Sequence, residues 1–244
     1  MMTESGISQN EPQAAIVNEF CMTICTVNGS GSGTANNALY RALFKMGIPT
    51  SGKNIFPSNI KGLPTWFVIR SSARGYIGRV PYDDIIVAMN PATFLDDVTY
   101  LPDGGVIFYA DHIDLPENIN PRLVLYPMPI RSLLQEADVP RNMRSYMENM
   151  LYVGIVGQVL GITREALNES LAQHFHGKPE IFESNFNMVM RGFDWAAAHL
   201  EKKDRYSVKA LPALKDCILT DGNNAAALGS LFGGMQFCSW YPIT

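Results

Sequence analysis

The stretch Phe20-Cys-Met-Thr-Ile-Cys-Thr-Val27, followed by Asn28-Gly-Ser-Gly-Ser-Gly-Thr34, decides the fold. Its first half is apolar and β-branched, which predicts a buried strand. The three alternating glycines predict a tight turn, and Ala35 to Met46 then carries apolar residues at helical spacing. Free amides at a helix start carry partial positive charge, so this turn is expected to favour an anion such as phosphate.

Length and composition indicate a globular protein. The chain has 244 residues, 47% of them hydrophobic, which is enough for one large or two modest domains with a sizeable core. Its apolar runs fall short of the ~20 residues of a membrane span, and its first ten residues lack the basic and apolar parts of a signal peptide. We therefore expect a soluble, cytoplasmic protein that contacts neither membrane nor nucleic acid.

The cysteines and histidines do not predict a metal site. No C-x-x-C pair occurs among Cys21, Cys25, Cys217 and Cys238. On one strand face the first two lie about 13 Å apart, at roughly 3.3 Å per residue, too far to hold one metal. We expect all four to be buried apolar residues, because free cysteine is among the most buried residue types. His174 and His176, two residues apart at a helix end, should point in different directions.

Charge is distributed unevenly along the chain. The net charge is −4, yet Phe20 to Tyr82 contains no acidic residue and seven basic ones, so that segment is +7 and the remainder is −11 (−11 + 7 = −4). The seven basic residues are Arg41, Lys45, Lys53, Lys61, Arg70, Arg74 and Arg79. Basic charge around a glycine turn raises the local concentration of anionic ligands. Alternatively, some of these residues pair with acids elsewhere in the fold.

Apolar strands alternate with helical segments through most of the chain, which predicts an α/β protein: a three-layer, Rossmann-like, largely parallel sheet with helices on both faces, plus a helical C-terminal part. Further strands are expected at Thr65–Ser71, Ile85–Met89, Val106–Tyr109 and Leu123–Tyr126, with a hairpin return through Tyr76–Arg79. Further helices are expected at Ala92–Asp97, Ile130–Ala137, Arg141–Leu160, Arg164–Phe175, Pro179–Leu200 and Asn223–Phe232. Gly154, Gly157 and Gly161, near the end of the expected helix 141–160, are expected to allow close packing.

Three segments have less regular patterns. Gly47 to Pro64 contains three prolines and three glycines beside several apolar residues, which indicates a structured binding loop. Residues 1–18 are polar and are expected to form a flexible arm, and the charged run from Glu201 begins an expected linker over 201–219. The segment from Gly233 to Thr244 predicts a buried strand that is cut off at its C-terminal end, as in a fragment of a longer protein.

A nicotinamide or flavin site is the main alternative for the glycine turn. The G-x-G-x-x-G pattern would need glycine at position 34, which is Thr34, and an acidic residue about 20 positions later, which this segment lacks. A P-loop would need Gly-Lys-Ser/Thr, which does not follow at the required spacing. The pattern therefore favours a phosphate-bearing ligand over a standard NAD site.

Several motifs together resemble the gamma domain of 2-oxoacid:ferredoxin (acceptor) oxidoreductases, as fused at the start of the alpha subunit of the 2-oxoglutarate type. They are Asn28–Gly33, Phe56–Arg70, Gly75–Arg79, and Asn185 with Gly192 in the last long helix. Thr220–Gly229 and Trp240–Thr244 resemble the opening of the following pyrimidine-binding domain. The resemblance implies a gamma domain over 19–200 and the start of the next domain over 220–244.

The resemblance implies a role in a thiamine diphosphate enzyme. Such enzymes decarboxylate a 2-oxoacid oxidatively, transfer the acyl group to coenzyme A and pass single electrons through an iron–sulfur cluster to ferredoxin. The family places the diphosphate, its Mg and the nearest cluster mostly on a partner beta subunit, with which a heterodimer or a dimer of heterodimers is expected. This chain would supply the coenzyme A side and would be inactive alone.

The resemblance also suggests site residues. Thr244 ends a Tyr-Pro-Ile-Thr motif whose threonine contacts the 2-oxoacid carboxylate in the family. The glycine turn (Gly29, Ser30, Gly31, Ser32, Gly33, Thr34) is expected to bind coenzyme A phosphates, with Lys53, Ser58, Asn59 and Lys61 nearby. Many relatives have Arg-Gly-Gly where this chain has Lys61-Gly62-Leu63, so the family pattern does not fix the contacts of Lys61.

Two other interpretations of the sequence remain. The glycines can serve only to let the domain pack tightly against a partner subunit, while the ligand touches other residues. Alternatively, the chain is a binding module outside thiamine chemistry: a nucleotide-binding or NAD(P)-dependent protein, or an interaction protein that uses the region of Trp66 and Tyr76.

Overall fold

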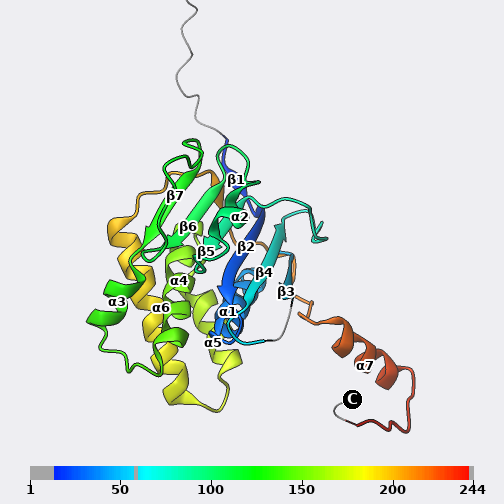
Figure 1. Cartoon of the computed structure of the whole chain (residues 1–244). Coiled ribbons are helices and arrows are strands. Elements are labelled where there is room, and N and C mark those ends of the chain that lie inside the picture. The colour runs from blue at the N-terminus through cyan, green and yellow to red at the C-terminus, as the bar shows by residue number, and fades with distance from the viewer. Residues whose placement is uncertain (1–13, 58–59, 242–244) are drawn as a thin grey trace, which may run out of the picture.

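The computed structural model describes residues 14–57 and 60–241. Helices and strands alternate along most of this length (Figure 1). In chain order they are β1 (Ile16–Val17), β2 (Glu19–Val27), α1 (Ser32–Lys45), β3 (Thr50–Ile55), β4 (Pro64–Ser72), β5 (Ile85–Ala88), α2 (Phe94–Val98), β6 (Val106–Ala110), β7 (Val124–Met128), α3 (Ile130–Glu136), α4 (Arg144–Leu160), α5 (Arg164–His174), α6 (Pro179–His199), β8 (Tyr206–Ser207) and α7 (Gly222–Phe232).

The main sheet has six strands in the order β3-β4-β2-β5-β6-β7. The strands β2, β5, β6 and β7 run parallel, whereas β4 lies antiparallel to both β2 and β3. The predicted α/β class is confirmed, and the parallel part lies on one side of β2. Because parallel strands end at the same edge of a sheet, the turn after β2 lies at the carboxyl edge beside β5.

The two faces of this sheet are covered unequally. One face is buried under α1, α4, α5 and α6, which lie together behind the sheet in Figure 1. Within the described residues, the other face carries only the short helix α2 and its adjoining loops, over a smaller apolar cluster that includes Cys25, Ile86 and Phe94. Helices therefore lie on both faces, as predicted, but no helix of the described ranges covers part of the α2 face.

Glycines let α4 and α6 pack backbone against backbone. A Cβ atom at Gly154 would lie 1.9 Å from the carbonyl oxygen of Val189, and one at Gly192 would lie 2.3 Å from that of Leu151. Neither distance is compatible with a side chain, so both positions require glycine. The prediction that glycines near the end of the helix 141–160 serve close packing is confirmed at Gly154.

The predicted loop over 47–64 is wrong for residues 50–55, which form strand β3. These residues pair with β4 in antiparallel register, from Thr50 opposite Ser71 to Ile55 opposite Trp66. β3 is an edge strand, so its outer side and its polar side chains remain exposed, which hid its strand character in the sequence. Gly52 leaves room for the rings of Phe67 and Tyr40, since a Cβ atom there would lie 2.9 Å and 3.2 Å from them.

The predicted hairpin return through Tyr76–Arg79 is also wrong. Residues 76–79 form no strand and are exposed. Both edges of β4 are already paired, with β3 and with β2, so no edge is free for a third strand. The segment instead forms an exposed loop that leads to β5.

The ends of the described chain combine regular and exposed segments. Strand β1 pairs in parallel with β8, and Asn18 donates to and accepts from the backbone of Lys209, both at 2.8 Å. Short parts of the predicted arm and linker therefore have regular structure. No helix within the described ranges is long and apolar enough to cross a membrane.

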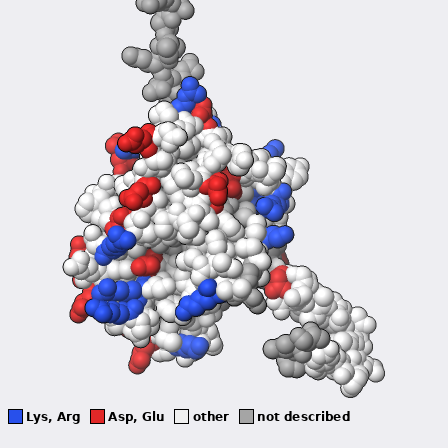
Figure 2. All heavy atoms as spheres, in the orientation of Figure 1, with Lys and Arg blue, Asp and Glu red and all other residues white. Residues whose placement is uncertain are grey.

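Helix α7 is confirmed, but it projects away from the rest of the molecule (Figure 1). The predicted buried strand after it is wrong for residues 235–241, which form no strand and are exposed, with Phe237 at 84% and Trp240 at 76%. Figure 2 shows few charged side chains on this projecting part. Cys217 and Cys238 lie here and are exposed, which corrects their predicted burial; Cys21 and Cys25 are buried.

Candidate functional site

The glycine turn links the carboxyl end of β2 to the start of α1. Gly29 and Gly31 have φ values of 82° and 85°, in the left-handed region that glycine adopts without strain. Both also allow close contacts. A Cβ atom at Gly29 would lie 2.7 Å from Cγ of Lys61, and one at Gly31 would lie 2.3 Å from Cδ1 of Tyr146.

Lys61 reaches the turn because its loop is hydrogen-bonded to Asn28. The backbone N–H of Asn28 donates to Leu63 O at 2.8 Å, and the backbone N–H of Gly62 donates to Asn28 O at 2.9 Å. The side-chain Nδ2 of Asn28 donates to Ile60 O at 3.2 Å. The structure thus brings together two predicted parts of the site, the glycine turn and Lys61.

Several polar groups of the turn are used in folding. Ser30 O accepts hydrogen bonds from Ser145 Oγ and Asn149 Nδ2 of helix α4, each at 2.9 Å. The buried Ser32 accepts from Thr26 Oγ1 at 2.9 Å. These contacts fix the turn against α4 and support a packing role for it. Gly29 and Gly33 remain exposed.

A basic cluster, made of Lys61, Arg41 and Lys178, lies beside the first turn of α1. Thr34 Oγ1 lies 3.3 Å from Nε2 of His174 at the end of α5. Burial lowers the pKa of His174, and the nearby cations Arg41 and Lys178 lower it further. Gly31 caps α1 in the left-handed conformation, and none of the described residues of the first helical turn is acidic. The helix start, Lys61, Arg41 and Lys178 therefore all favour an anion here.

The remaining predicted residues fall elsewhere. Lys53 pairs with Val68 across β3 and β4, and Val68 points to the α2 face of the sheet, whereas α1 covers the opposite face. Ser58, Asn59 and Thr244 lie outside the described residues. Within the described ranges, no group of three or more histidine, cysteine, aspartate or glutamate side chains could hold a metal ion.

Two residues of this site were not predicted as ligand contacts. His174 was considered only as a metal ligand, and Tyr146 carried no signal at all. Both come from helices more than 100 residues after the turn in sequence, and only the packing of α4 and α5 brings them to it.

Comparison with known proteins identifies the family. A family model described as pyruvate ferredoxin/flavodoxin oxidoreductase matches residues 21–195, which include the glycine turn, the Lys61 loop and helices α1 to α5. The chain belongs to this family. The NAD(P) alternative therefore has no support beyond the glycines themselves.

Relatives with similar sequences carry the name of an alpha subunit. The "2-oxoacid:ferredoxin oxidoreductase 1, subunit alpha" of Sulfurisphaera tokodaii is 22% identical over 88% of this chain and 39% of its own length. A 2-oxoacid:ferredoxin oxidoreductase alpha subunit of Saccharolobus solfataricus is 27% identical over 47% of this chain and 17% of its own length. The chain thus spans about two fifths of the length of the first of these relatives.

Solved structures share the fold. The 2-oxoglutarate:ferredoxin oxidoreductase of Magnetococcus marinus, described with 2-oxoglutarate, coenzyme A and succinyl-CoA bound, matches 93% of this chain and 39% of its own, with a TM-score of 0.80 and 25% identity. The PORC subunit of pyruvate oxidoreductase from Thermotoga maritima matches 72% of this chain and 96% of its own, with a TM-score of 0.57 and 18% identity. The latter likeness concerns the fold alone.

Proposed function

We propose that this chain is the gamma-domain part of a 2-oxoacid:ferredoxin oxidoreductase subunit and forms the coenzyme A side of its active site. The observation that carries the proposal is the match to the Magnetococcus marinus enzyme over 93% of this chain, because that enzyme is described with coenzyme A and 2-oxoglutarate bound. The basic cluster at the glycine turn supports it, since coenzyme A carries a diphosphate and a ribose phosphate.

The proposed reaction is oxidative decarboxylation of a 2-oxoacid, with 2-oxoglutarate as the proposed substrate, to acyl-CoA and carbon dioxide, with ferredoxin as electron acceptor. Thiamine diphosphate, held with Mg on a partner beta subunit, would supply the decarboxylation chemistry, and an iron–sulfur cluster there would carry electrons. Residues 220–244 are proposed to open the pyrimidine-binding domain, with Thr244 contacting the 2-oxoacid carboxylate.

In this proposal the residues of the chain bind and orient coenzyme A. The amides at the start of α1 and the ammonium group of Lys61 hold phosphate oxygens, and the stem of Lys61 stays against Gly29. Thr34 and His174 extend the polar surface along α1. Ser58 and Asn59, which lie outside the described residues, are proposed as further contacts to the same ligand, whereas Lys53 belongs to the opposite face of the sheet.

The test is activity of the complete two-subunit enzyme. We expect it to reduce ferredoxin or methyl viologen when 2-oxoglutarate and coenzyme A are both supplied, and to form succinyl-CoA in equal amount to the carbon dioxide released. Parallel assays with pyruvate and other 2-oxoacids would define the substrate. Absence of coenzyme A-dependent activity with every 2-oxoacid, in an enzyme loaded with thiamine diphosphate and clusters, would contradict the proposal.

A further inference from the structure

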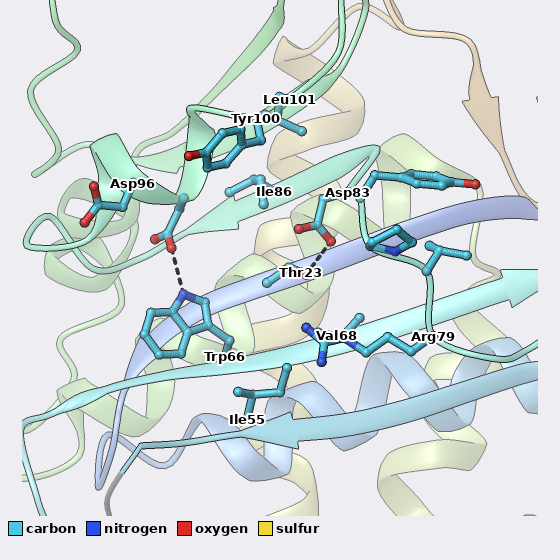
Figure 3. Close-up of a pocket in the computed structure, with 14 residues that line it drawn as sticks. Thr23, Ile55, Trp66, Val68, Arg79, Asp83, Ile86, Asp96, Tyr100 and Leu101 are labelled. Carbon is cyan, nitrogen blue, oxygen red and sulfur yellow. Dashed lines mark hydrogen bonds between the residues drawn. The ribbon is translucent and has the colours of Figure 1, made fainter.

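A cavity of about 480 Å³ lies on the α2 face of the sheet, on the opposite face from α1. Its floor is formed by side chains of β2, β3, β4 and β5, and its walls by the loop before β5 and by the end of α2 with the residues that follow (Figure 3). The volume is within the range of roughly 300–1,000 Å³ that is typical of small-molecule sites. The proposed coenzyme A role does not use this cavity.

The cavity is lined by more negative than positive charge. Asp83, Asp96 and Asp97 contribute three carboxyl groups, and Arg79 contributes the only guanidinium or ammonium group of the lining among the described residues. In Figure 3 the side chain of Arg79 reaches inward below Asp83, while Asp96 stands on the opposite wall. In the part of the chain that the structure describes, none of these three carboxyl groups forms a salt bridge.

Neutral donors hold two of these carboxyl groups in place. Asp83 accepts from Thr23 Oγ1 at 2.6 Å, and Asp97 accepts from Trp66 Nε1 and Thr93 Oγ1, each at 2.7 Å. Burial raises the pKa of Asp83, against the smaller lowering effect of its hydrogen bonds to Thr23 and Cys21. Arg79 lies close enough to lower the pKa of Asp83 in part, but one guanidinium group faces three carboxyl groups in this lining, so a bound cation would add the charge compensation that is missing.

Apolar and aromatic groups make up the rest of the lining. Trp66, Tyr82 and Tyr100 line the cavity together with apolar residues that include Ile55 and Leu101. Tyr100 is 89% exposed. Aromatic faces attract organic cations, and carboxylates pair with them, so both kinds of group favour the same ligand.

We propose that this cavity is a second binding site, which takes a small organic cation: an ammonium, amidinium or guanidinium group on a flat or aliphatic body. The charged head pairs with Asp83 and Asp97, and the body lies among Trp66, Tyr100 and the apolar floor. This site is separate from the glycine turn, because none of the residues that line the cavity belongs to the turn between β2 and α1.

Benzamidine and benzamide provide a matched pair of probes, since they differ mainly in charge. Binding to the complete chain can be followed by the indole N–H resonance of Trp66, which donates to Asp97. Trp195 and Trp240, which do not line the cavity, serve as internal references. We expect a saturable shift of the Trp66 signal with benzamidine, and at least tenfold weaker binding of benzamide.

Asp83→Asn and Asp97→Asn keep an acceptor oxygen but remove the charge, and each is expected to weaken benzamidine binding about tenfold. Asp103→Asn is the control, because Asp103 pairs with Arg122 away from the cavity lining. No saturable shift with benzamidine, or equal binding of benzamide, would overturn the proposal, and so would full affinity in both folded cavity variants. The comparison of the two probes on the unchanged chain stands even if a variant fails to fold.

Discussion

The two cysteines of strand β2 lie in environments that lower the reactivity of their thiols. Cys21 is buried in β2, with its Sγ 3.5 Å from Oδ1 of Asp83. Burial, and then the charge of Asp83, raise the pKa of the Cys21 thiol to about 12. Burial also raises the pKa of Cys25 well above its ordinary value. A raised thiol pKa means less thiolate, which is the reactive form.

We therefore predict that iodoacetamide at pH 8 modifies Cys217 and Cys238 and leaves Cys21 and Cys25 unmodified in the folded chain. With a pKa of about 12, only about one Cys21 thiol in ten thousand is ionised at pH 8. Mass mapping of the labelled peptides, with and without denaturant, measures this directly. Equal labelling rates for Cys21 and Cys217 before unfolding would show that the thiol of β2 is accessible.

The glycines of the turn differ in whether a side chain would fit at their position, which gives a second prediction at the residue scale. Gly31→Ala is expected to lower the free energy of unfolding by about 1–2 kcal/mol from the left-handed conformation alone, with a further loss from displacing Tyr146. Gly33→Ala should instead raise it by roughly 0.5–1 kcal/mol, because Gly33 is helical and a Cβ atom there meets nothing within 4 Å. Urea denaturation of both variants distinguishes the two effects; equal stabilities would contradict the described turn.

At the scale of elements, helices α4 and α6 pack with their backbones in direct contact. Gly154→Ala places a Cβ atom against the backbone of Val189, so the helices must separate, and we predict a loss of about 1–3 kcal/mol in stability. Gly157→Ala is the matched control. Its nearest neighbour is the flexible Leu167 side chain at 3.3 Å, and alanine favours the helix by about 1 kcal/mol. Thermal unfolding should show a lower midpoint for the first variant and an unchanged or higher one for the second.

Most elements could be predicted from the sequence because they are long, apolar and regular in period. Strand β3 could not, because an edge strand with one unpaired side keeps polar residues and resembles a loop. The return strand that was predicted after β4 is wrong for the opposite reason. Its residues are suitable for a strand, but β4 is already hydrogen-bonded to β2 on one edge and to β3 on the other, so no edge of β4 is free to pair with it.

At the scale of the whole molecule, the candidate site combines residues that could be predicted from the sequence with residues that only the folded chain brings close to them. The glycine turn and Lys61 were predicted from a local motif and from the acid-free segment. His174, Tyr146 and Asn149 join the site through α4 and α5, and no local pattern connects them to residue 31. The cavity beneath α2 was likewise not predicted, since its lining comes from four strands, helix α2 and two loops.

The projecting segment around α7 is also a property of the whole molecule. Its exposed apolar residues include Leu231, Phe232 and Phe237, which no described part of the chain covers. This exposure is consistent with the proposal that residues 220–244 belong to a further domain.

The KM for coenzyme A of the complete two-subunit enzyme, compared between the unchanged protein and Lys61→Ala, tests the central claim most directly. A charge-assisted phosphate contact contributes about 1.5–3 kcal/mol, so we predict that KM for coenzyme A rises roughly 10- to 100-fold while KM for the 2-oxoacid stays the same. Lys45→Ala is the control: it removes the same charge from the same basic segment, but at the far end of α1, beside Glu169. An unchanged KM for coenzyme A in Lys61→Ala, or an equal rise in Lys45→Ala, would contradict the placement of coenzyme A at the glycine turn.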